Sequence, residues 1–596
     1  MDKIAKVALP IGLGKEFDYL YSGDSRLTEG MRVLVDFNGK KAIGVVTGLV
    51  LTSAIKKLKN IIKVLDEGAV LSQEQIQLAR NLSEFYPYQP AEFIFMMLPA
   101  YLRKVRKTQI TVEVKEPTAG LKGEKLFIKG DSFQERYKAW KIKAEEGLKL
   151  GSVLICFPQI SYLLKAKETL EKDFPNRIKV LHSRQGEKEL FSNWNESRSK
   201  TLILGVRAAI FHYPADLRLV VVEQENSPYY FQEEKPFYHL RDVAKMLCDL
   251  KKISLVLSGG HPSLEVYKDI KEDKIKLREI NSPEKEMKIM GLPDLNKNKI
   301  VGPVLTEIIR KAVQEKNRLL IVWNRKGFAR IIYCSDCGHI FTCGHCSGYL
   351  QTSLKEDEAS CPYCQRRVKL EPVCGYCRRG YLKRGGFGIE RLRETLRKFF
   401  PEVRIDDWQS RSRQSQVVLA TAQVLSTLYE PPTFETGCVL DTDHMLSKTD
   451  YEAAFDTFLY LKKLLALFSR QLYVFTHNRQ HYLFQYLNAE WRDFYEAELR
   501  LRERFALPPF GLIAKITLRS KSENNLIKKT QELYNILIKK FIQVYGPFKE
   551  EPFKLRDKYR YSLVIKAKRD SFSRKAVKKE IVSFRASSVK IAVTFR

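Results

Sequence analysis

Eight cysteines in four C-x-x-C pairs constrain this chain more than any other feature of its sequence. They all lie between positions 334 and 377, as the pairs Cys334/Cys337, Cys343/Cys346, Cys361/Cys364 and Cys374/Cys377. One tight C-x-x-C turn supplies two thiolates, and a closed structural zinc site takes four. The eight cysteines therefore predict two structural zinc ions per chain.

Cysteine pairs of this kind have two other uses in proteins. A disulfide framework needs an oxidising compartment, which nothing in the sequence indicates. A thioredoxin-like pair comes singly beside a βαβ pattern, so it accounts poorly for four pairs. We expect a nested arrangement in which the first and fourth pairs hold one ion and the two inner pairs hold the other. His339 and His345 are expected at the surface, because eight sulfurs already fill two sites.

The chain is strongly basic. Its 596 residues are enough for three or four domains, and its net charge is +33, from 103 basic and 70 acidic residues. This excess is spread along the chain and predicts a polyanionic partner, with nucleic acid first and an acidic membrane surface second. Without an apolar run of 18 residues or a cleavable apolar leader, we expect a cytoplasmic protein and no membrane partner.

Hydropathy patterns divide the chain into four parts, which we expect at 1–105, 106–285, 286–490 and 491–596. The first alternates apolar and polar residues, as a β-rich domain does, and ends in a helix over about 72–86 with a Ser72/Gln75 capping box. In the second and third, short apolar runs alternate with helical stretches, which is typical of parallel α/β sheets. A zinc module at 330–385 interrupts the third.

The last part contains a predicted helix over about 523–543 and a basic stretch from Lys566 to Lys579. Three further cysteines sit in apolar runs and are expected to be small core residues; they are Cys156, Cys248 and Cys438.

Short motifs along nearly the whole chain resemble, in the same order, those of the primosomal protein N′ (PriA) family of replication-restart helicases. Besides the cysteine spacing, they are Phe17-Asp18-Tyr19, Gly205–Phe211, Tyr238-His239 with Arg241-Asp242, Ser258–Ser263, Asn324–Phe328, GFGIERL at 386–392, Phe494-Tyr495, Pro508-Pro509-Phe510 and Lys554-Leu555-Arg556. The resemblance implies two RecA-like helicase lobes, a two-zinc insertion in the second lobe, an N-terminal 3′ DNA-end-binding domain and an α+β C-terminal domain. The short segment after residue 105 leaves no room for the family's winged helix.

The helicase motifs of this family are degraded in this sequence. Where the family carries a P-loop, G-x-x-x-x-G-K-[ST], only Gly130 remains in a short loop, so no lysine reaches a phosphate and no hydroxyl holds Mg²⁺. Where it carries D-E-E-H, the chain has Glu223-Gln224-Glu225-Asn226, and of its arginine fingers only Arg470 is left. We expect a degenerate nucleotide site at Gly130, Glu223 and Glu225, no catalytic residues, and no productive binding of ATP or Mg²⁺.

The resemblance also implies DNA contacts. Phe17 would stack on a terminal base, Asp18 would accept a hydrogen bond from a 3′ hydroxyl, and Lys59 would meet a phosphate. Strand packing of Phe17 and a solvated Lys59 are the plainer alternatives. Two C-terminal arginines, Arg556 and Arg560, are expected on a phosphate-binding face. An aromatic stretch, Tyr229-Tyr230-Phe231 with Phe237-Tyr238, is either a base-stacking platform or core.

These observations predict a replication-restart, primosome-assembly protein that binds branched DNA at stalled forks and recruits the helicase-loading machinery without being a helicase. Its expected partners are branched and single-stranded DNA and primosome proteins, docked in part by the zinc module. Two alternatives remain: an active ATP-dependent 3′→5′ DNA helicase, and a basic nucleic-acid-binding protein without fork specificity.

Overall fold

The computed structural model forms two compact units, which are described separately. The first contains residues 1–281 with 569–583 and Phe595, and the second contains 282–568 with 584–594 and Arg596. The structure describes residues 3–11, 16–23, 26–55, 57–105, 123–196, 200–280, 285–291, 301–323, 331–352, 358–385, 389–412, 414–427, 434–448, 450–584 and 589–596.

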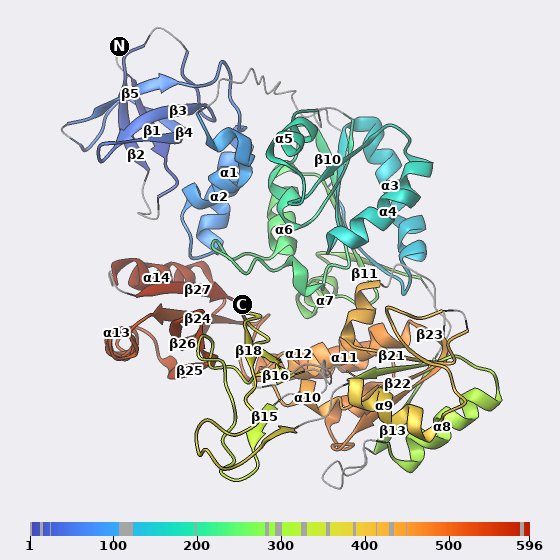
Figure 1. The fold of residues 1–596 in the computed structure, drawn as a ribbon. Helices are drawn as coiled ribbons and strands as arrows, with labels where there is room; N and C mark the ends of the chain where they lie inside the picture. Colours follow the sequence, from blue (N-terminus) through green and yellow to red (C-terminus); the bar gives the residue numbers. More distant parts are fainter. Residues whose placement is uncertain are drawn as a thin grey trace. The chain divides into compact units, whose positions relative to one another are not determined.

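The first unit begins with a closed β-barrel whose strands are ordered β1-β2-β5-β3-β4 (Figure 1). The strands are β1 (Lys3–Ala8), β2 (Phe17–Tyr21), β3 (Arg32–Phe37), β4 (Lys40–Val50) and β5 (Lys59–Val64). Alternate residues, such as Ala5, Val7, Val33 and Val35, fill the interior, as the period-two pattern predicts. This confirms the β-rich N-terminal domain.

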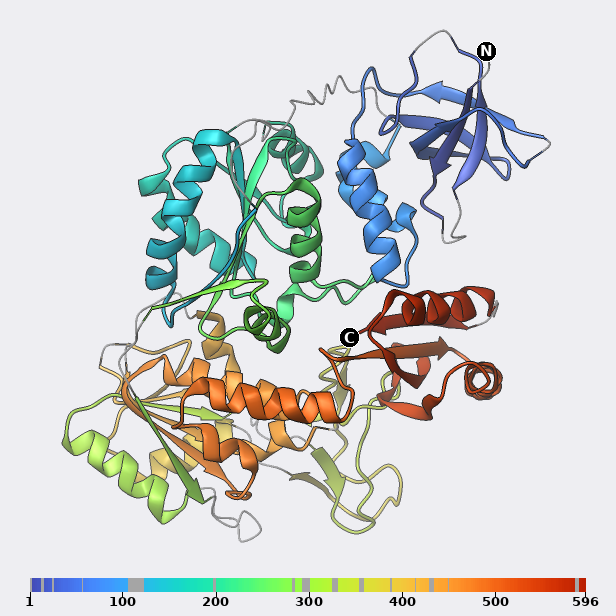
Figure 2. The ribbon, with the colours of Figure 1, turned by 180° about the vertical axis from the view of Figure 1, so that it is seen from behind.

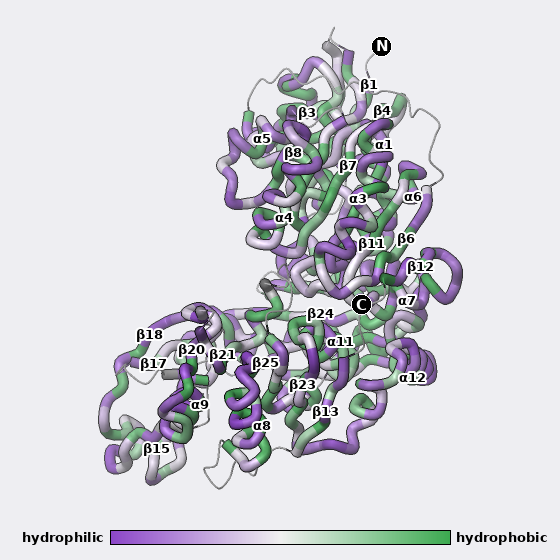
Figure 3. Tube along the Cα trace, turned by 90° about the vertical axis from the view of Figure 1, so that its right-hand side faces the viewer, coloured by the Kyte–Doolittle hydropathy of each residue, from purple (hydrophilic) through white to green (hydrophobic). Residues whose placement is uncertain are grey.

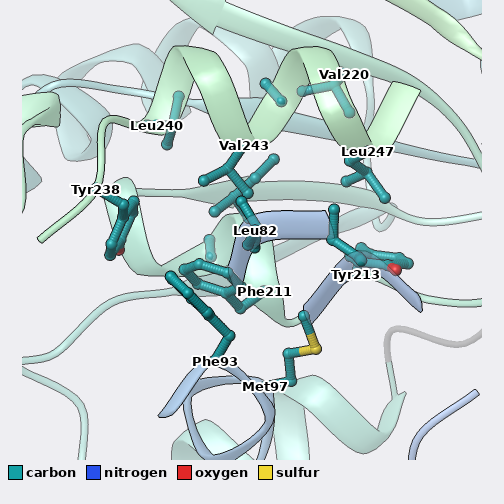
Figure 4. Packing of buried hydrophobic residues seen from close by; sticks show 14 of the residues in the cluster. Leu82, Phe93, Met97, Phe211, Tyr213, Val220, Tyr238, Leu240, Val243 and Leu247 are labelled. Atoms are coloured by element: carbon teal, nitrogen blue, oxygen red, sulfur yellow. The ribbon is translucent and has the colours of Figure 1, made fainter. Parts of the chain in front are cut away.

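Two helices follow the barrel, α1 (Gln73–Phe85) and α2 (Pro90–Met97). The α1 capping box is present, with the Ser72 hydroxyl accepting from the Gln75 N–H and the Gln75 side chain accepting from the Ser72 N–H. Both helices share one buried core with the α/β lobe that follows, and Figure 4 shows Leu82, Phe93 and Met97 against Phe211 and Val243.

Polar contacts tie these helices to other elements of the first unit. The Tyr86 hydroxyl at the end of α1 donates to Asp242 over 2.9 Å. Helix α14 (Ser571–Ser583) also lies against α1. Its Arg574 guanidinium donates to the Phe85 carbonyl over 2.8 Å, and its Lys578 ammonium donates to the Tyr88 carbonyl over 2.6 Å. Two basic residues of the C-terminal stretch therefore donate hydrogen bonds to backbone carbonyls of the protein itself.

The lobe is a seven-stranded parallel sheet in the order β12-β6-β11-β10-β7-β9-β8. Its strands are β6 (Lys125–Lys129), β7 (Ser152–Cys156), β8 (Ile178–Leu181), β9 (Leu202–Gly205), β10 (Leu217–Glu223), β11 (Ser254–Gly259) and β12 (Lys276–Glu279). Its main helices are α3 (Phe133–Leu150), α4 (Ile160–Asp173), α5 (Glu187–Glu196), α6 (Leu240–Lys251) and α7 (Leu264–Lys271).

Helices cover both faces of this sheet. Figure 2 shows α3 and α4, in cyan, on one side of the strands and α6, in green, on the other. Figure 3 shows why: hydrophobic residues gather in the strands, whereas the helices alternate between hydrophobic and hydrophilic residues. Strands β7 and β10 are buried almost throughout, as a sheet covered on both faces requires. Cys156 and Cys248 are core residues here, as expected.

The second unit contains a six-stranded parallel sheet in the order β13-β23-β22-β14-β21-β20. Its strands are β13 (Glu286–Gly291), β14 (Leu319–Trp323), β20 (Ile405–Asp407), β21 (Val417–Ala420), β22 (Phe434–Leu440) and β23 (Phe468–Thr476). Its helices include α8 (Pro303–Gln314), α9 (Ile389–Phe399), α10 (Asp443–Leu446), α11 (Ala453–Leu465) and α12 (Trp491–Arg504). Cys438 is buried in β22, as expected.

A cysteine-rich module lies between β14 and α9. Its strands are short: β15 (Ile331–Cys334), β16 (Gln351–Thr352), β17 (Glu358–Ser360), β18 (Arg367–Lys369) and β19 (Leu382–Gly385). Strand β15 pairs with β19, so the module leaves and re-enters the lobe through neighbouring strands.

A four-stranded sheet, β25-β26-β24-β27, forms the C-terminal domain with helix α13 packed on it. The elements are β24 (Gly511–Ser520), α13 (Glu523–Leu537), β25 (Gln543–Leu555), β26 (Lys558–Lys568) and β27 (Lys590–Phe595). The helix predicted to reach residue 543 ends at Leu537, because the chain turns there and enters β25. Leu526, Leu533 and Leu537 are buried as expected.

No helix of the described residues combines the length and the apolar composition needed to cross a lipid bilayer.

Candidate metal centre, nucleotide-site remnant and DNA contacts

The eight cysteines form two separate clusters of four. The outer cluster contains Cys334, Cys337, Cys374 and Cys377, and the inner cluster contains Cys343, Cys346, Cys361 and Cys364. This is the nested grouping expected from the sequence. Within each cluster the sulfur atoms all lie within 4.8 Å of one another.

The sulfur positions fit a tetrahedral zinc ion. With Zn–S bonds of about 2.3 Å, neighbouring sulfurs should lie roughly 3.8 Å apart. The distances are 3.5 Å between Cys334 and Cys377, 4.0 Å between Cys337 and Cys374, and 3.8 Å between Cys343 and Cys364. Four thiolates at this spacing can hold one zinc ion in each cluster and leave no open position for catalysis.

The backbone around the cysteines stabilises thiolates. The N–H groups of Asp336 and Gly380 point at the sulfurs of Cys334 and Cys377, over 3.4 and 3.5 Å. The Gly380 N–H is the main cause that lowers the pKa of Cys377 to about 6, and the Arg366 N–H does the same for Cys364. A Cβ atom on Gly380 would lie 2.4 Å from the Cys334 sulfur, so only glycine fits beside the outer cluster.

The two histidines of the module are not members of either four-sulfur cluster. His339 is exposed and stacks on Tyr376, with ring centroids 4.8 Å apart. His345 pairs through Nε2 with Asp557 over 2.8 Å, while its Nδ1 lies 3.7 Å from the Cys346 sulfur. His345 is therefore a neighbour of the inner site, half-buried rather than a plain surface residue.

In the first lobe, the loop that follows β6 has no phosphate cradle. Gly130 donates its N–H to the Gly259 carbonyl over 3.1 Å, and α3 already begins at Phe133. Ser132 and Glu135 form a capping box that satisfies N–H groups at this helix end. The Glu135 carboxylate also places a negative charge in the first turn of α3, and this charge would repel a phosphate at the helix N-terminus.

A buried arginine fills the space beside this loop. The Arg136 guanidinium donates to the Gly130 carbonyl over 2.6 Å and to the Glu223 carboxylate over 2.9 Å. Both ionic side chains are fully buried, and Tyr162 and Ser258 donate further hydrogen bonds to Glu223. Burial alone would lower the pKa of Arg136, but the adjacent Glu223 charge raises it, so the guanidinium stays protonated.

Glu225 is bonded internally in the same way. Its carboxylate accepts from the Ser263 N–H over 2.5 Å and from the Arg241 guanidinium over 3.3 Å. The three residues expected at a degenerate nucleotide site, Gly130, Glu223 and Glu225, are all bonded to partners within the lobe. The first two are joined through Arg136.

In the second lobe, Arg470 has an acidic partner on the surface. This residue lies in strand β23, and its exposed guanidinium pairs with Glu315 over 3.3 Å. Of the family motifs matched in this lobe, Asn324–Phe328 and residues 386–388 lie outside the described residues.

The three residues expected to bind a DNA end lie on neighbouring strands of the barrel. Strand β2 carries Phe17 and Asp18 and pairs with β5, where Lys59 stands opposite Tyr19. Phe17 is half-buried and packs edge-on against Phe37 at 5.0 Å.

Their polar groups already have partners. Asp18 accepts from the Ser53 hydroxyl over 2.6 Å and from the Lys6 ammonium over 3.3 Å, and Lys59 pairs with Asp36. A DNA end would exchange these partners for its own hydroxyl and phosphate groups, so DNA roles for Phe17, Asp18 and Lys59 stay predictions.

The two C-terminal arginines lie in different settings. Arg556 is exposed, and its backbone N–H donates to the Cys346 sulfur over 3.5 Å. The Arg560 guanidinium donates two hydrogen bonds to the Pro552 carbonyl, of 2.9 and 3.1 Å. Their phosphate contacts stay predictions, and Arg560 has fewer donors left for a phosphate than Arg556 has.

The aromatic stretch is mostly core. Tyr230 and Tyr238 are fully buried, and the Tyr230 hydroxyl donates to the Glu223 carbonyl. Phe231 and Phe237 stack on each other, and Tyr229 alone in this stretch is exposed, at 54%. Core packing therefore accounts for this stretch better than a stacking platform does.

Sequence reasoning missed Arg136. A signal was present, because the apolar face of α3, with Phe133, Tyr137 and Trp140, is interrupted by this one charged residue. A charge on a buried helix face needs a partner, but the sequence does not say which one.

Known proteins match this chain at both ends and along nearly its whole length. The 3′ DNA-binding domain of PriA matches residues 6–99, and the primosomal protein N C-terminal domain matches residues 503–595. The replication restart protein PriA of Rickettsia conorii is 25% identical, with 94% of each chain covered. That of Borreliella burgdorferi is 24% identical, covering 88% of this chain and 87% of the relative.

Among solved structures, RecG bound to a three-way DNA junction matches 72% of this chain and 47% of its own, at 10% identity and a TM-score of 0.32. The two domain matches and the relatives at 24–25% identity show that this chain is similar to PriA proteins from end to end.

Proposed function

We propose that this protein binds branched DNA with an accessible 3′ end and supports replication restart as a scaffold, without hydrolysing ATP. The match of residues 6–99 to a 3′ DNA-binding domain supports the DNA-end role, and the names of the relatives support the restart role. The net charge of +33 supplies the electrostatic part of the affinity.

The buried ion pair of Arg136 and Glu223 is the main support for the proposal that ATP hydrolysis is lost. ATP needs N–H donors and a lysine at its phosphates and a carboxylate at its Mg²⁺ ion. Here the loop turns carbonyl oxygens toward Arg136, and the carboxylate that would face Mg²⁺ is bonded to that arginine. A nucleotide would have to break a fully buried ion pair in order to enter.

The zinc module is proposed as a docking surface for single-stranded DNA or primosome proteins. Four of its tyrosines expose between 44% and 76% of their surface; they are Tyr349, Tyr363, Tyr376 and Tyr381. Exposed basic residues lie among them, including Arg366, Arg367, Arg378 and Arg379. Tyrosine and arginine together are typical of surfaces that stack on bases or anchor partner proteins.

Two measurements test the proposal, one for the loss of ATP hydrolysis and one for the recognition of a 3′ end. ATP hydrolysis is measured with and without a DNA fork, and the affinity is compared for forks ending in a 3′ hydroxyl and in a 3′ phosphate. We expect no DNA-stimulated turnover and at least about tenfold tighter binding of the hydroxyl, because Asp18 can accept from a hydroxyl but repels a phosphate. Turnover near 1 s⁻¹ would show a working motor instead.

The variants Asp18→Ala and Asp18→Asn should lose most of this discrimination. Glu67→Gln, which removes an exposed acidic charge after the barrel, is the matched control and should keep it. Equal affinity of the parent protein for the two forks would favour the second candidate, a basic binder without end specificity. The internal bonds of Asp18 to Ser53 and Lys6 are the observation that keeps this candidate open.

A further inference from the structure

A hairpin turn of the C-terminal domain lies against the inner cysteine cluster. We propose that this turn, Arg556 and Asp557 between β25 and β26, is part of the inner metal site and holds the Cys343–Cys346 knuckle in its metal-binding shape. The inference rests on the proposed zinc ions. It assigns a role to residues about 200 positions beyond the cysteines.

The closest contact reaches a sulfur directly. The Arg556 N–H donates to the Cys346 sulfur over 3.5 Å, as backbone N–H groups do within the cysteine module itself. Such a bond stabilises the thiolate charge that the metal requires. The donor here comes from another domain, so the inner cluster is complete only when the hairpin is in place.

Asp557 holds the knuckle at a second point. Its carboxylate pairs with the Nε2 atom of His345 over 2.8 Å, and its N–H donates to the His345 carbonyl over 3.0 Å. The other ring nitrogen of His345 lies 3.7 Å from the Cys346 sulfur. Asp557 therefore orients an imidazole that stands against a metal ligand.

Further contacts fix the rest of the knuckle. The Lys554 N–H donates to the Ser347 hydroxyl over 2.9 Å, and its ammonium donates to the Gly344 carbonyl over 3.0 Å. Leu555 packs against the small hydrophobic cluster that contains Cys343, Cys346 and Cys361. Four consecutive residues of the hairpin, 554–557, thus contact the inner site.

The backbone of the turn indicates that these contacts matter. Arg556 and Asp557 have φ angles of +49° and +60°. A two-residue hairpin loop with positive φ at both positions favours Asn-Gly, because a Cβ is strained there. This turn instead has arginine and aspartate at the two strained positions, and the aspartate carboxylate contacts His345.

The outer cluster is supported from within the module. The N–H donors to Cys334 and Cys377 belong to residues of the module itself: Asp336, Cys337, Arg379 and Gly380. The two metal sites should therefore differ: the inner one depends on the C-terminal domain, and the outer one does not.

The test uses the full chain and measures zinc rather than activity. Zinc content is determined by native mass spectrometry, and zinc release to a chelator is followed over time. The main variant is Arg556→Asn with Asp557→Gly, which gives the turn its preferred sequence and keeps both N–H groups but removes the carboxylate. Asp557→Asn is the second variant, and Glu371→Gln, an exposed acid elsewhere in the module, is the control.

We expect both hairpin variants to release one of the two zinc ions about tenfold faster or more, in line with other groups that orient metal ligands. The control should release both ions at the parent rate. When Cys374→Ser is added to a hairpin variant, the outer ion is lost. The single ion that remains should then be released at the accelerated rate.

Release at the parent rate in both hairpin variants, or acceleration of the outer ion instead, would overturn the inference. A parent protein that holds no zinc would instead refute the proposed metal sites, so the two failures can be told apart. A second readout is hydrogen exchange: after zinc removal, the amides of Arg556 and Asp557 should lose protection, and unchanged protection would contradict the coupling.

Discussion

The Arg136 guanidinium and the Glu223 carboxylate form a fully buried ion pair, 2.9 Å from Nε to Oε1, at the carboxyl edge of the first parallel sheet. In open α/β sheets this edge is where ligands bind, and in a helicase lobe it receives the nucleotide. Here the protein places its own cation there. The pair therefore links the stability of the lobe to the proposed loss of nucleotide binding.

Breaking this pair should strongly destabilise the first unit. Arg136→Met leaves Glu223 buried without its counter-charge, and we expect a loss of about 3–5 kcal/mol in unfolding free energy. Adding Glu223→Gln should restore part of this loss, because a neutral amide can still accept from Ser258. Urea unfolding measures both. As a control, Lys104→Met breaks the exposed pair with Glu187 and should change stability by about 1 kcal/mol or less.

The two cysteine clusters should lose zinc one at a time. The parent chain should hold two ions, and Cys343→Ser and Cys374→Ser should each hold one, because they affect different clusters. Thiolate binding supplies the folding free energy of such modules, so each variant should also lose hydrogen-exchange protection around its own cluster. Elemental analysis that gives one zinc or none for the parent would contradict the nested two-ion arrangement.

Two half-buried histidines should make the first unit sensitive to acid. Burial lowers the pKa of both His212 and His239 from 6.5 to about 4, and Nδ1 of His239 accepts a hydrogen bond from the Arg241 N–H, which requires the neutral ring. As the pH falls, each histidine is protonated in the unfolded chain at a higher pH than in the folded protein. Its contribution to the unfolding free energy is therefore fully present above pH 6.5 and is lost as the pH falls to about 4. Each contributes on the order of 3 kcal/mol over this range.

His239→Asn should flatten this dependence because it removes the titrating ring, and asparagine can still cap α6. The measurement is the urea midpoint at several pH values between 4 and 7. His477→Asn, at an exposed histidine, is the control and should follow the parent. A His239→Asn curve as steep as that of the parent would assign the acid sensitivity to other groups.

Substitutions of Lys59 and of Asp36 should change the affinity for DNA in opposite directions. Lys59→Ala removes a phosphate-binding charge, so the slope of log K against log salt should become shallower by about 0.9. Asp36→Asn frees the ammonium from its ion pair, so binding should tighten without a change in fork preference. Fluorescence anisotropy from 50 to 200 mM salt measures both. An unchanged slope in Lys59→Ala would place this lysine outside the DNA contact.

The local elements were predictable because their signals are local. The α1 capping box depends on residues three apart, and the eight cysteines could be grouped by nesting their pairs. Where a local pattern had two structural explanations, prediction was less secure. The aromatic stretch turned out to be mostly core, and α13 ended earlier than its apolar pattern indicated, because the chain turns into β25.

The sequence by itself determined the two four-cysteine clusters, the parallel lobes and the β-rich character of the N-terminal domain, since these follow from spacing and periodicity; that the β-rich strands close into a barrel came from the structure. Only the tertiary structure decided that Arg136 pairs with Glu223, 87 positions away, and that the Arg556–Asp557 turn meets the inner cysteines. The physical reason is that a buried charge or a thiolate needs a partner, but any element that the fold brings near can supply one. The partner is fixed only when the chain has packed.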